Sequence, residues 1–214
     1  MSTMSDRERW DQKYLNQQAS SGSPVKVLLE NSHLLPTSGR ALEIACGLGA
    51  NALWLAGRGL EVHAWDVSGV AIERLDAEAA RRGVLVNTQR RDVRQEPPRA
   101  GAWDLIVITR FLERTIAPAV IAALRPGGVL VYQTFTQARV GSGGPRRSAY
   151  RLGEGELLAL FSGLRPVVYR EEGLTGDTTQ GVRDQAILVA QRPTDSACGD
   201  RSAAVLRKDP QAGS

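Results

Sequence analysis

The sequence predicts an α/β fold: a Rossmann-like, doubly wound, mostly parallel sheet of seven strands with an antiparallel strand pair at its C-terminal end. Strand-like and helix-like segments alternate from residue 40 onward, which is typical of a parallel sheet covered by helices. Residues 103–108 carry a nearly continuous apolar run, as expected for a strand that is buried on both faces. The last two strand-like segments follow each other without a helix, so we expect them to pair antiparallel.

The individual elements follow from local signals. Ser5, with Glu8 three residues later, forms a capping-box pattern that starts a helix through Trp10 and Tyr14, and a second short helix starts at residues 23–24. Later helices begin after a turn or a serine cap and end near glycine. The predicted strands are 41–46, 60–65, 84–90, 103–108, 129–135, 166–171 and 184–191, and the predicted later helices are 51–58, 68–83, 116–124 and 154–161.

Length and composition bound the organisation of the chain. Its 214 residues suffice for one full-sized domain, and we expect an N-terminal helical segment (1–39), a core (40–192) and a disordered tail (193–214). No apolar run is long enough to cross a bilayer and no secretory signal pattern precedes the core, so we expect a cytoplasmic protein without a membrane partner. Two cysteines and two histidines are too few for a disulfide framework or a zinc site, so no metal is expected.

Charge is concentrated in one place. The 27 basic and 23 acidic residues leave a net charge of +4, which is too mild by itself to indicate nucleic-acid binding. Arg139, Arg146, Arg147 and Arg151 lie in a glycine-rich stretch without one acidic residue. This stretch follows the fifth strand, so we expect it to overhang the edge of the sheet where parallel strands end.

The turn after the first strand is the strongest site signal. Gly47 and Gly49 let a ligand approach the backbone closely, and the helix that follows offers unpaired N–H groups at its start. With Ala52 these glycines also fit the looser dinucleotide-binding pattern. Asp66, 17 residues after Gly49, ends the second strand, where an acid can bind the hydroxyls of a ribose or simply cap a helix together with Ser68.

Three acidic residues end or flank consecutive strands on their carboxyl edge: Glu43, Asp66 and Asp92. That edge is where open α/β sheets bind ligands. A pyrophosphate-containing dinucleotide gains little from so many acids, whereas a cationic ligand with a ribose and an adenine gains contacts to its hydroxyls, its amine and its positive charge. S-adenosyl-L-methionine is such a ligand.

The sequence resembles the class I S-adenosylmethionine-dependent methyltransferases, and among them the small tellurite-resistance and thiopurine methyltransferase-like group. The similarity spans roughly residues 9–192. Ala45 departs from the pattern, because the superfamily often has a glycine there. The matching segments are WDQKY (10–14), ALEIACGLGANALWLA (41–56), DVS (66–68), DV (92–93), WDLIV (103–107), FLxR (111–114) and LxPGGVL (124–130).

The resemblance implies a cofactor, S-adenosyl-L-methionine, with S-adenosyl-L-homocysteine as its product, and a role for each matched residue. Glu43 and Gly47, with Gly49 nearby, hold the methionine end, and Asp66 binds the ribose. Val67 packs on the adenine, Asp92 meets its amino group, and Thr109 and Arg110 lie beside the sulfonium. Tyr14 closes over the cofactor, although an aromatic residue in this position more often packs a helix onto its domain. The complete predicted cofactor site is Tyr14, Glu43, Ala45, Gly47, Gly49, Asp66, Val67, Asp92, Val93, Thr109 and Arg110.

For the methyl acceptor the sequence predicts a small molecule. Only Tyr132, Tyr150 and Glu113 are loose candidates for a base, and a soft acceptor such as a thiol or a chalcogen needs none. The predicted acceptor residues are Arg114, Arg146, Arg147, Tyr150 and Arg151, with 139–151 as a flexible lid or as an ordinary surface loop.

Three alternatives stay open: a nicotinamide-dependent oxidoreductase, a methyltransferase for RNA or protein, and a non-catalytic S-adenosylmethionine-binding protein. The first lacks an acid/base for hydride transfer, and the second lacks a recognition domain and a strongly basic face. The chain is expected to be a monomer or a homodimer.

Overall fold

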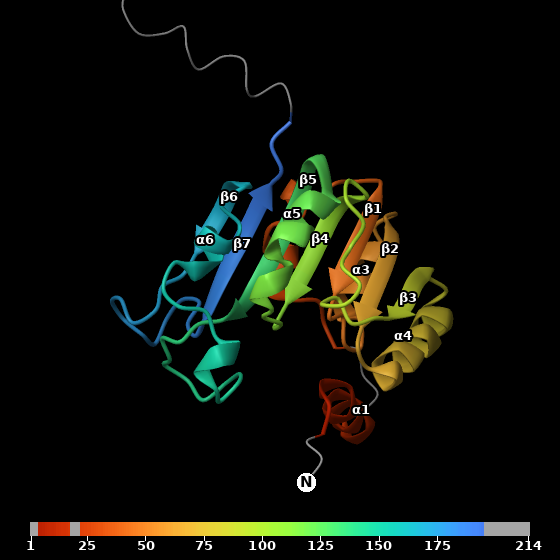
Figure 1. Ribbon diagram of the computed structural model, residues 1–214, viewed down its shortest axis with the longest axis horizontal. Coiled ribbons are helices and arrows are strands. Elements are labelled where there is room, and N and C mark those ends of the chain that lie inside the picture. Colours follow the sequence, from red (N-terminus) through yellow and green to blue (C-terminus); the bar gives the residue numbers. More distant parts are fainter. Residues whose placement is uncertain (1–3, 18–21, 195–214) are drawn as a thin grey trace, which may run out of the picture.

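A seven-stranded sheet forms the centre of the molecule, in the computed structural model that describes residues 4–17 and 22–194 (Figure 1). Its strand order is β3-β2-β1-β4-β5-β7-β6, with β3 to β5 parallel and β7 antiparallel to both β5 and β6. The predicted fold class and the antiparallel C-terminal pair are therefore confirmed. The strands are β1 (Arg40–Ile44), β2 (Glu61–Asp66), β3 (Val86–Arg90), β4 (Trp103–Thr109), β5 (Leu124–Phe135), β6 (Arg165–Arg170) and β7 (Gln185–Gln191).

The helices begin and end at the residues that local chemistry favours. The hydroxyl of Ser5 accepts from the Glu8 N–H and the Glu8 carboxylate accepts from the Ser5 N–H, so the predicted capping box is confirmed. Ser68 caps the longest helix, which ends at Gly83 in the left-handed conformation. The helices are α1 (Asp6–Asn16), α2 (Lys26–Glu30), α3 (Ala50–Ala56), α4 (Gly69–Arg82), α5 (Ala117–Ala123) and α6 (Glu156–Leu160), with 3₁₀ turns η1 (Ser32–Leu34), η2 (Arg114–Ile116) and η3 (Ser148–Tyr150).

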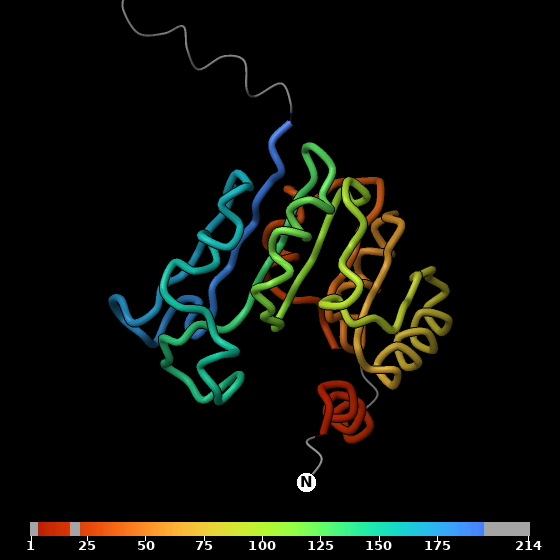
Figure 2. The backbone as a smooth tube through the Cα atoms, in the orientation of Figure 1, coloured from red at the N-terminus to blue at the C-terminus, as the bar shows by residue number. Residues whose placement is uncertain are grey.

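Alternate residues of the strands point to opposite faces of the sheet, and each face is covered by a layer of apolar side chains. In β4, Leu105 and Val107 pack with α2, α3 and α4 on one face, while Ile106 and Ile108 pack with α5 and α6 on the other. Figure 2 shows α5 crossing in front of β4 and β5. All four of these side chains are fully buried, which explains the nearly continuous apolar run in the sequence.

The carboxyl ends of the five parallel strands lie at one edge of the sheet. Helix α1 and the loop of residues 137–153 both lie at this edge, α1 below β1 to β3 and the loop below β5 and β7 in the view of Figure 1. The overhanging position predicted for this loop is therefore confirmed. Helix α1 contains no buried residue and is held at this edge mainly by polar contacts, described below.

Two differences from the predicted boundaries concern short stretches. Strand β5 begins at Leu124, earlier than the predicted residue 129, because Leu124 pairs with Trp103 across an irregularity in the β4–β5 ladder. Helix α6 is shorter than predicted, since Gly155 takes the left-handed conformation and serves as its N-cap. The tail from residue 195 lies outside the described residues, and within the described ranges no helix is long and apolar enough to span a membrane.

Candidate functional site

The turn after β1 requires three residues in the left-handed conformation. Ala45, Gly47 and Gly49 have φ angles of 55°, 55° and 76°. A side chain at Gly47 would meet the Tyr14 hydroxyl at 2.8 Å, and one at Gly49 would meet Leu75 at 2.2 Å, so both positions need glycine. Ala45 adopts the same conformation at a cost of about 1–2 kcal/mol, which gives a physical reason for the glycine that the superfamily often has there.

Glu43 lies at the base of this turn and is fully buried. Its carboxyl group accepts hydrogen bonds from the Asn51 side chain at 2.7 Å and from the Ala52 backbone N–H at 2.9 Å. Burial raises the pKa of Glu43 to about 8, which favours the protonated carboxyl group at neutral pH. A cationic group beside it would favour the charged form.

Asp66 holds the same turn from β2. Its two carboxylate oxygens accept from the Gly47 N–H at 2.8 Å and from the Ser68 N–H at 2.9 Å, and the residue is only 5% exposed. Burial raises the pKa of Asp66, while the two backbone hydrogen bonds act in the opposite direction. Each carboxylate oxygen keeps a second lone pair, so Asp66 can accept a further hydrogen bond from a ligand.

Helix α1 covers this turn. The Tyr14 ring stacks on Trp10 with 5.7 Å between centroids, and its hydroxyl lies against Gly47. Burial and the nearby Asp66 raise the pKa of Tyr14, so the phenol stays a hydrogen-bond donor. The Asp11 carboxylate fixes α1 to the start of α4, accepting from the Ser68 hydroxyl at 2.5 Å and from the Val70 N–H at 3.3 Å.

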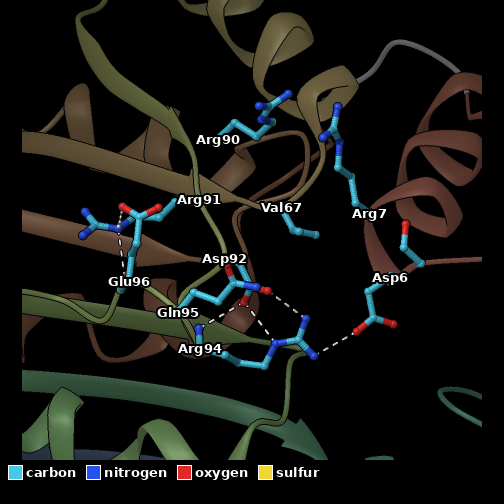
Figure 3. A pocket seen from close by; sticks show the side chains of 10 residues that line it. Asp6, Arg7, Val67, Arg90, Arg91, Asp92, Arg94, Gln95 and Glu96 are labelled. Atoms are coloured by element: carbon cyan, nitrogen blue, oxygen red, sulfur yellow. Dashed lines mark hydrogen bonds and ion pairs between the residues drawn. The ribbon is translucent and has the colours of Figure 1, made fainter.

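A cleft of about 460 Å³ opens between α1 and the loops after β2 and β3 (Figure 3). Arg94 crosses it: its guanidinium donates to both oxygens of Asp92, at 3.0 and 2.9 Å, and to Asp6 of α1 at 3.0 Å. Arg94 therefore holds the pKa of Asp92 below its usual range. The lining residues are Ser5, Asp6, Arg7, Val67, Arg90, Arg91, Asp92, Arg94, Gln95 and Glu96.

The remaining predicted cofactor residues lie at the same edge but differ in exposure. Val93 is buried in the apolar layer of α5 and α6 and does not line the cleft. Thr109 is half-buried, and its hydroxyl accepts from Asn51 at 3.3 Å. Arg110 is exposed in the left-handed conformation (φ 54°), held by its N–H donating to Gln133 at 2.8 Å.

The predicted acceptor residues divide into two groups. Arg114 and Arg151 are turned into the structure: Arg114 binds Glu156 and the carbonyls of Ala149 and Arg151, and the buried Arg151 donates to the carbonyls of Thr136, Gly143 and Pro145. Loop carbonyls and Glu156 thus take up the guanidinium groups of these two arginines, and their contact with the acceptor stays a prediction. The other predicted residues, Arg146, Arg147 and Tyr150, are exposed.

The Arg151→Lys variant should loosen the loop of residues 137–153. A lysine ammonium cannot reach three carbonyls in the planar arrangement of a guanidinium, so part of the loop loses its buried donors. We expect trypsin to cut after Arg146 or Arg147 at least about tenfold faster, from a loss of roughly 1.5–3 kcal/mol of local stability. Arg170→Lys, at an exposed pair with Glu172, is the matched control, and equal cleavage rates in both variants would contradict the bracing role.

Sequence reasoning missed several residues that organise the site. Asn51 joins Glu43 and Thr109, and its own oxygen accepts from the Val25 N–H at 2.9 Å. Asp11 and Arg94 connect α1 to the core. Arg94 lies two residues after Asp92, so the sequence offers a signal for their ion pair. It offers no signal for contacts between residues far apart in the chain, such as Arg94 with Asp6. No group of three or more His, Cys, Asp or Glu side chains that could hold a metal occurs in the part of the chain that the structure describes.

The donor set fits S-adenosylmethionine. A left-handed glycine turn without side chains, two buried carboxyl groups beside it and a third carboxylate at an open cleft match a ligand with an amino acid end, a ribose and an adenine. The turn can present only backbone atoms at these two positions, because a side chain at Gly47 would collide with Tyr14 and one at Gly49 with Leu75.

Comparisons with known proteins agree with this fit. A family model described as a methyltransferase domain matches residues 41–128. The ubiquinone biosynthesis O-methyltransferases of Burkholderia multivorans and Burkholderia vietnamiensis are 27% and 28% identical over 124 and 123 residues, which is 54% of this chain and 52% of each relative. The chain therefore matches about half the length of these curated relatives.

Solved structures show the same fold. TehB from Haemophilus influenzae superimposes with a TM-score of 0.65 at 19% identity, covering 86% of this chain and 67% of TehB. A structure described as "Conversion of a Disulfide Bond into a Thioacetal Group during Echinomycin Biosynthesis" gives 0.67 at 22%, covering 89% and 94%. Geranyl diphosphate C-methyltransferase from Streptomyces coelicolor, solved with S-adenosyl-L-homocysteine, gives 0.62 at 14%, covering 87% and 98%. These structures confirm the fold that the resemblance implies.

Proposed function

We propose that this chain, a class I S-adenosylmethionine-dependent methyltransferase by its domain and fold, moves a methyl group to a small-molecule acceptor. The observation that carries the proposal is the joint position of Glu43, Asp66 and the left-handed turn at Gly47 on the carboxyl edge. When bound, S-adenosylmethionine supplies a methyl group on a positively charged sulfur, which an acceptor lone pair takes as the carbon–sulfur bond breaks and its electrons stay on that sulfur.

The chain's own residues bind, orient and shield. Glu43 and Gly47 hold the amino acid end, Asp66 accepts from the ribose hydroxyls, and Val67 and Asp92 flank the adenine at the cleft. Thr109 and Arg110 stand at the reacting end, and Tyr14 covers the turn and excludes water. Alignment of two reactants in a water-poor site accounts for most of the rate gain such a transfer needs.

For the acceptor we propose a soft nucleophile, a thiol or a chalcogen. Two of the three candidate bases are engaged: the buried Tyr132 donates its hydroxyl to the Phe111 carbonyl at 2.9 Å, and Glu113 accepts from Thr115. Tyr150 is exposed on the loop. A thiolate or chalcogen lone pair attacks without a base, whereas a phenol needs a proton acceptor. The relatives named as O-methyltransferases make an oxygen acceptor the second candidate.

Turnover with methyl-labelled S-adenosylmethionine tests the proposal. We expect label transfer to at least one member of a panel of tellurite, selenite, small thiols and small phenols, with thiols or chalcogens ahead of phenols. Phenol methylation ahead of thiols would reverse the acceptor assignment. Tight binding of S-adenosyl-L-homocysteine with no transfer to this panel, RNA or protein would favour a non-catalytic binding protein, and binding of a nicotinamide dinucleotide in its place would favour the oxidoreductase.

A further inference from the structure

The loop of residues 137–153, called the wall below, is braced by buried and cross-linking side chains. Arg151 donates to two carbonyls of the loop and to that of Thr136 just before it. Arg114 joins Ala149 and Arg151 to Glu156 at the start of α6. The carboxylate of Glu156 also accepts from the Gly153 N–H at 2.7 Å. Because Arg114 starts the 3₁₀ turn η2 after β4, these contacts connect the wall to the segment that follows this strand.

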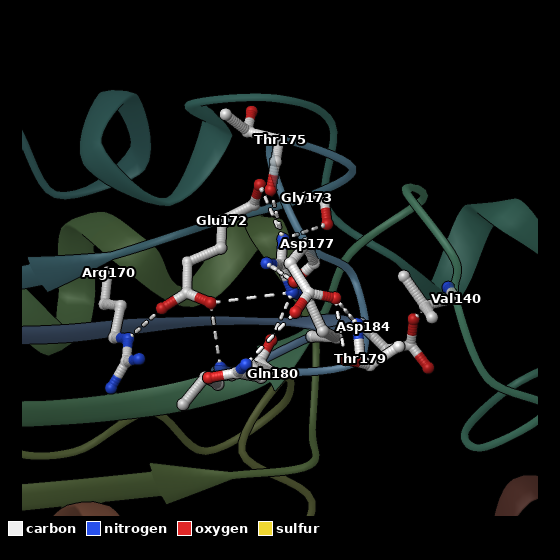
Figure 4. Close-up of polar contacts among 11 residues, drawn as sticks. Val140, Arg170, Glu172, Gly173, Thr175, Asp177, Thr179, Gln180 and Asp184 are labelled. Carbon is white, nitrogen blue, oxygen red and sulfur yellow. Dashed lines mark hydrogen bonds and ion pairs between the residues drawn. The ribbon is translucent and has the colours of Figure 1, made fainter.

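The β6–β7 connection, residues 171–184, braces the other side of this wall (Figure 4). Asp184, in the left-handed conformation with φ 62°, accepts from the backbone N–H groups of Val140 and Gly141. The neighbouring Arg183 donates to the carbonyls of Glu172, Gly173, Thr175, Asp177 and Gln180. The glycines at 141, 143 and 144 thus lie in a cross-linked structure, which opposes the flexibility predicted for this loop.

Among the described residues, arginine side chains without a partner are concentrated on this wall and next to it. In residues 4–17 and 22–194, six arginine side chains make no hydrogen bond, ion pair or ring contact, and four of them follow β4 or β5 at the carboxyl edge. These four, all exposed, are Arg110, Arg139, Arg146 and Arg147. The other two are Arg90, at the cofactor cleft, and Arg99, before β4.

Acidic residues near the wall do not neutralise these charges. Glu113 accepts from Thr115, Glu156 is paired with Arg114, and Asp184 is taken by loop N–H groups. On α1, burial and the nearby Arg110 lower the pKa of Lys13, so the positive charge of Arg110 extends to this helix. The carboxyl edge therefore carries acidic side chains at β1, β2 and β3 and basic side chains after β4 and β5.

We propose that Arg146 and Arg147 form an anion-binding subsite for the methyl acceptor on the carboxyl edge of the sheet, where Arg110 follows β4. The acceptor is then an organic anion that carries a carboxylate, phosphate or sulfonate group apart from its nucleophilic atom. Guanidinium groups bind such oxyanions in bidentate fashion, and the braced backbone limits how far the loop must move on binding. The subsite rests on the proposed methyl transfer, because it lies on the same edge of the sheet as the cofactor turn.

Two thiols that differ only in charge test the subsite. 3-Mercaptopropionate should bind the protein loaded with S-adenosyl-L-homocysteine at least about fivefold more tightly than 3-mercaptopropionamide in calorimetry. The variant Arg146→Gln/Arg147→Gln should bring the two affinities together and leave the affinity for S-adenosyl-L-homocysteine unchanged. Raising the salt from about 0.05 to 0.5 M should shrink the difference in the wild type. The control Arg58→Gln/Arg99→Gln removes two exposed arginines away from the wall and should leave the difference in affinity between the two thiols unchanged.

The outcomes separate the subsite from the proposed function. Equal affinities of the wild type for the two thiols, or an unchanged preference in the Arg146→Gln/Arg147→Gln variant, would overturn the subsite even where methyl transfer occurs. A charge preference that depends on Arg146 and Arg147 without any methyl transfer would keep the subsite and overturn the function. If the same variant weakened binding of a short single-stranded RNA but not of 3-mercaptopropionate, the wall would be a nucleic-acid contact instead.

Discussion

The Asp66→Ala variant is expected to lose at least about fiftyfold in affinity for S-adenosyl-L-homocysteine. Asp66 carries two backbone hydrogen bonds that shape the cofactor turn and offers further lone pairs to the ribose. Hydrogen bonds to a charged group contribute about 1.5–3 kcal/mol each, and losing one to the ligand together with the turn geometry accounts for this loss. Calorimetry well below the melting temperature measures it.

Stability should fall in the same variant. Two buried N–H groups lose their acceptor, at about 1–3 kcal/mol each, so the melting temperature drops along with the affinity. Glu73→Ala, which removes an exposed carboxylate from α4, is the matched control and should change neither quantity. Wild-type affinity in a folded Asp66→Ala protein would contradict the ribose assignment.

The Glu43→Gln variant should remove a pH dependence of stability. In the folded protein burial raises the pKa of Glu43 to about 8 from the ordinary 4.5, so the folded state keeps a proton that the unfolded chain has released between these values. The wild type therefore loses up to about 1.4 kcal/mol per pH unit as the pH rises from 4.5 toward 8, and the loss is complete above 8. Glutamine does not titrate, so its curve lacks this slope.

Urea unfolding of the two proteins without cofactor, at several pH values between 5 and 8.5, measures the difference in slope. The absolute stability of Glu43→Gln also contains the changed hydrogen bond to Asn51, so the slopes and not the values are compared. Glu154→Gln, at an exposed position of the loop before α6, is the control and should follow the wild type. Parallel curves for the wild type and Glu43→Gln would show that Glu43 is ionised in the folded protein.

Local patterns predicted most of the fold. The apolar run in β4 reflects its burial on both faces, the Ser5–Glu8 pair starts α1, and the missing helix between the last two strands requires their antiparallel pairing. These features depend on residues near one another in the chain or on a simple period. For the same reason the turn at Gly47 and the acids at the strand ends could be located from the sequence.

The bracing of the wall could not be predicted in this way. Arginine is usually exposed, and no local pattern distinguishes the buried Arg151 from the exposed Arg146 and Arg147. The partners of Arg151 are backbone carbonyls, which any sequence supplies. Asp184 reaches the loop across more than 40 residues, and Arg94 meets Asp6 across 88. Contacts of this kind follow from the fold and not from residue spacing.

A crystal structure with S-adenosyl-L-homocysteine tests the central claim most directly. It should show the ribose hydroxyls on Asp66, the adenine between Val67 and Asp92 in the cleft beside α1, and the amino acid end against Glu43 and Gly47 under Tyr14. The Arg94 guanidinium should remain near Asp92 or move aside for the adenine amine. Ligand bound away from the carboxyl ends of β1, β2 and β3, or no binding at saturating concentration, would contradict it.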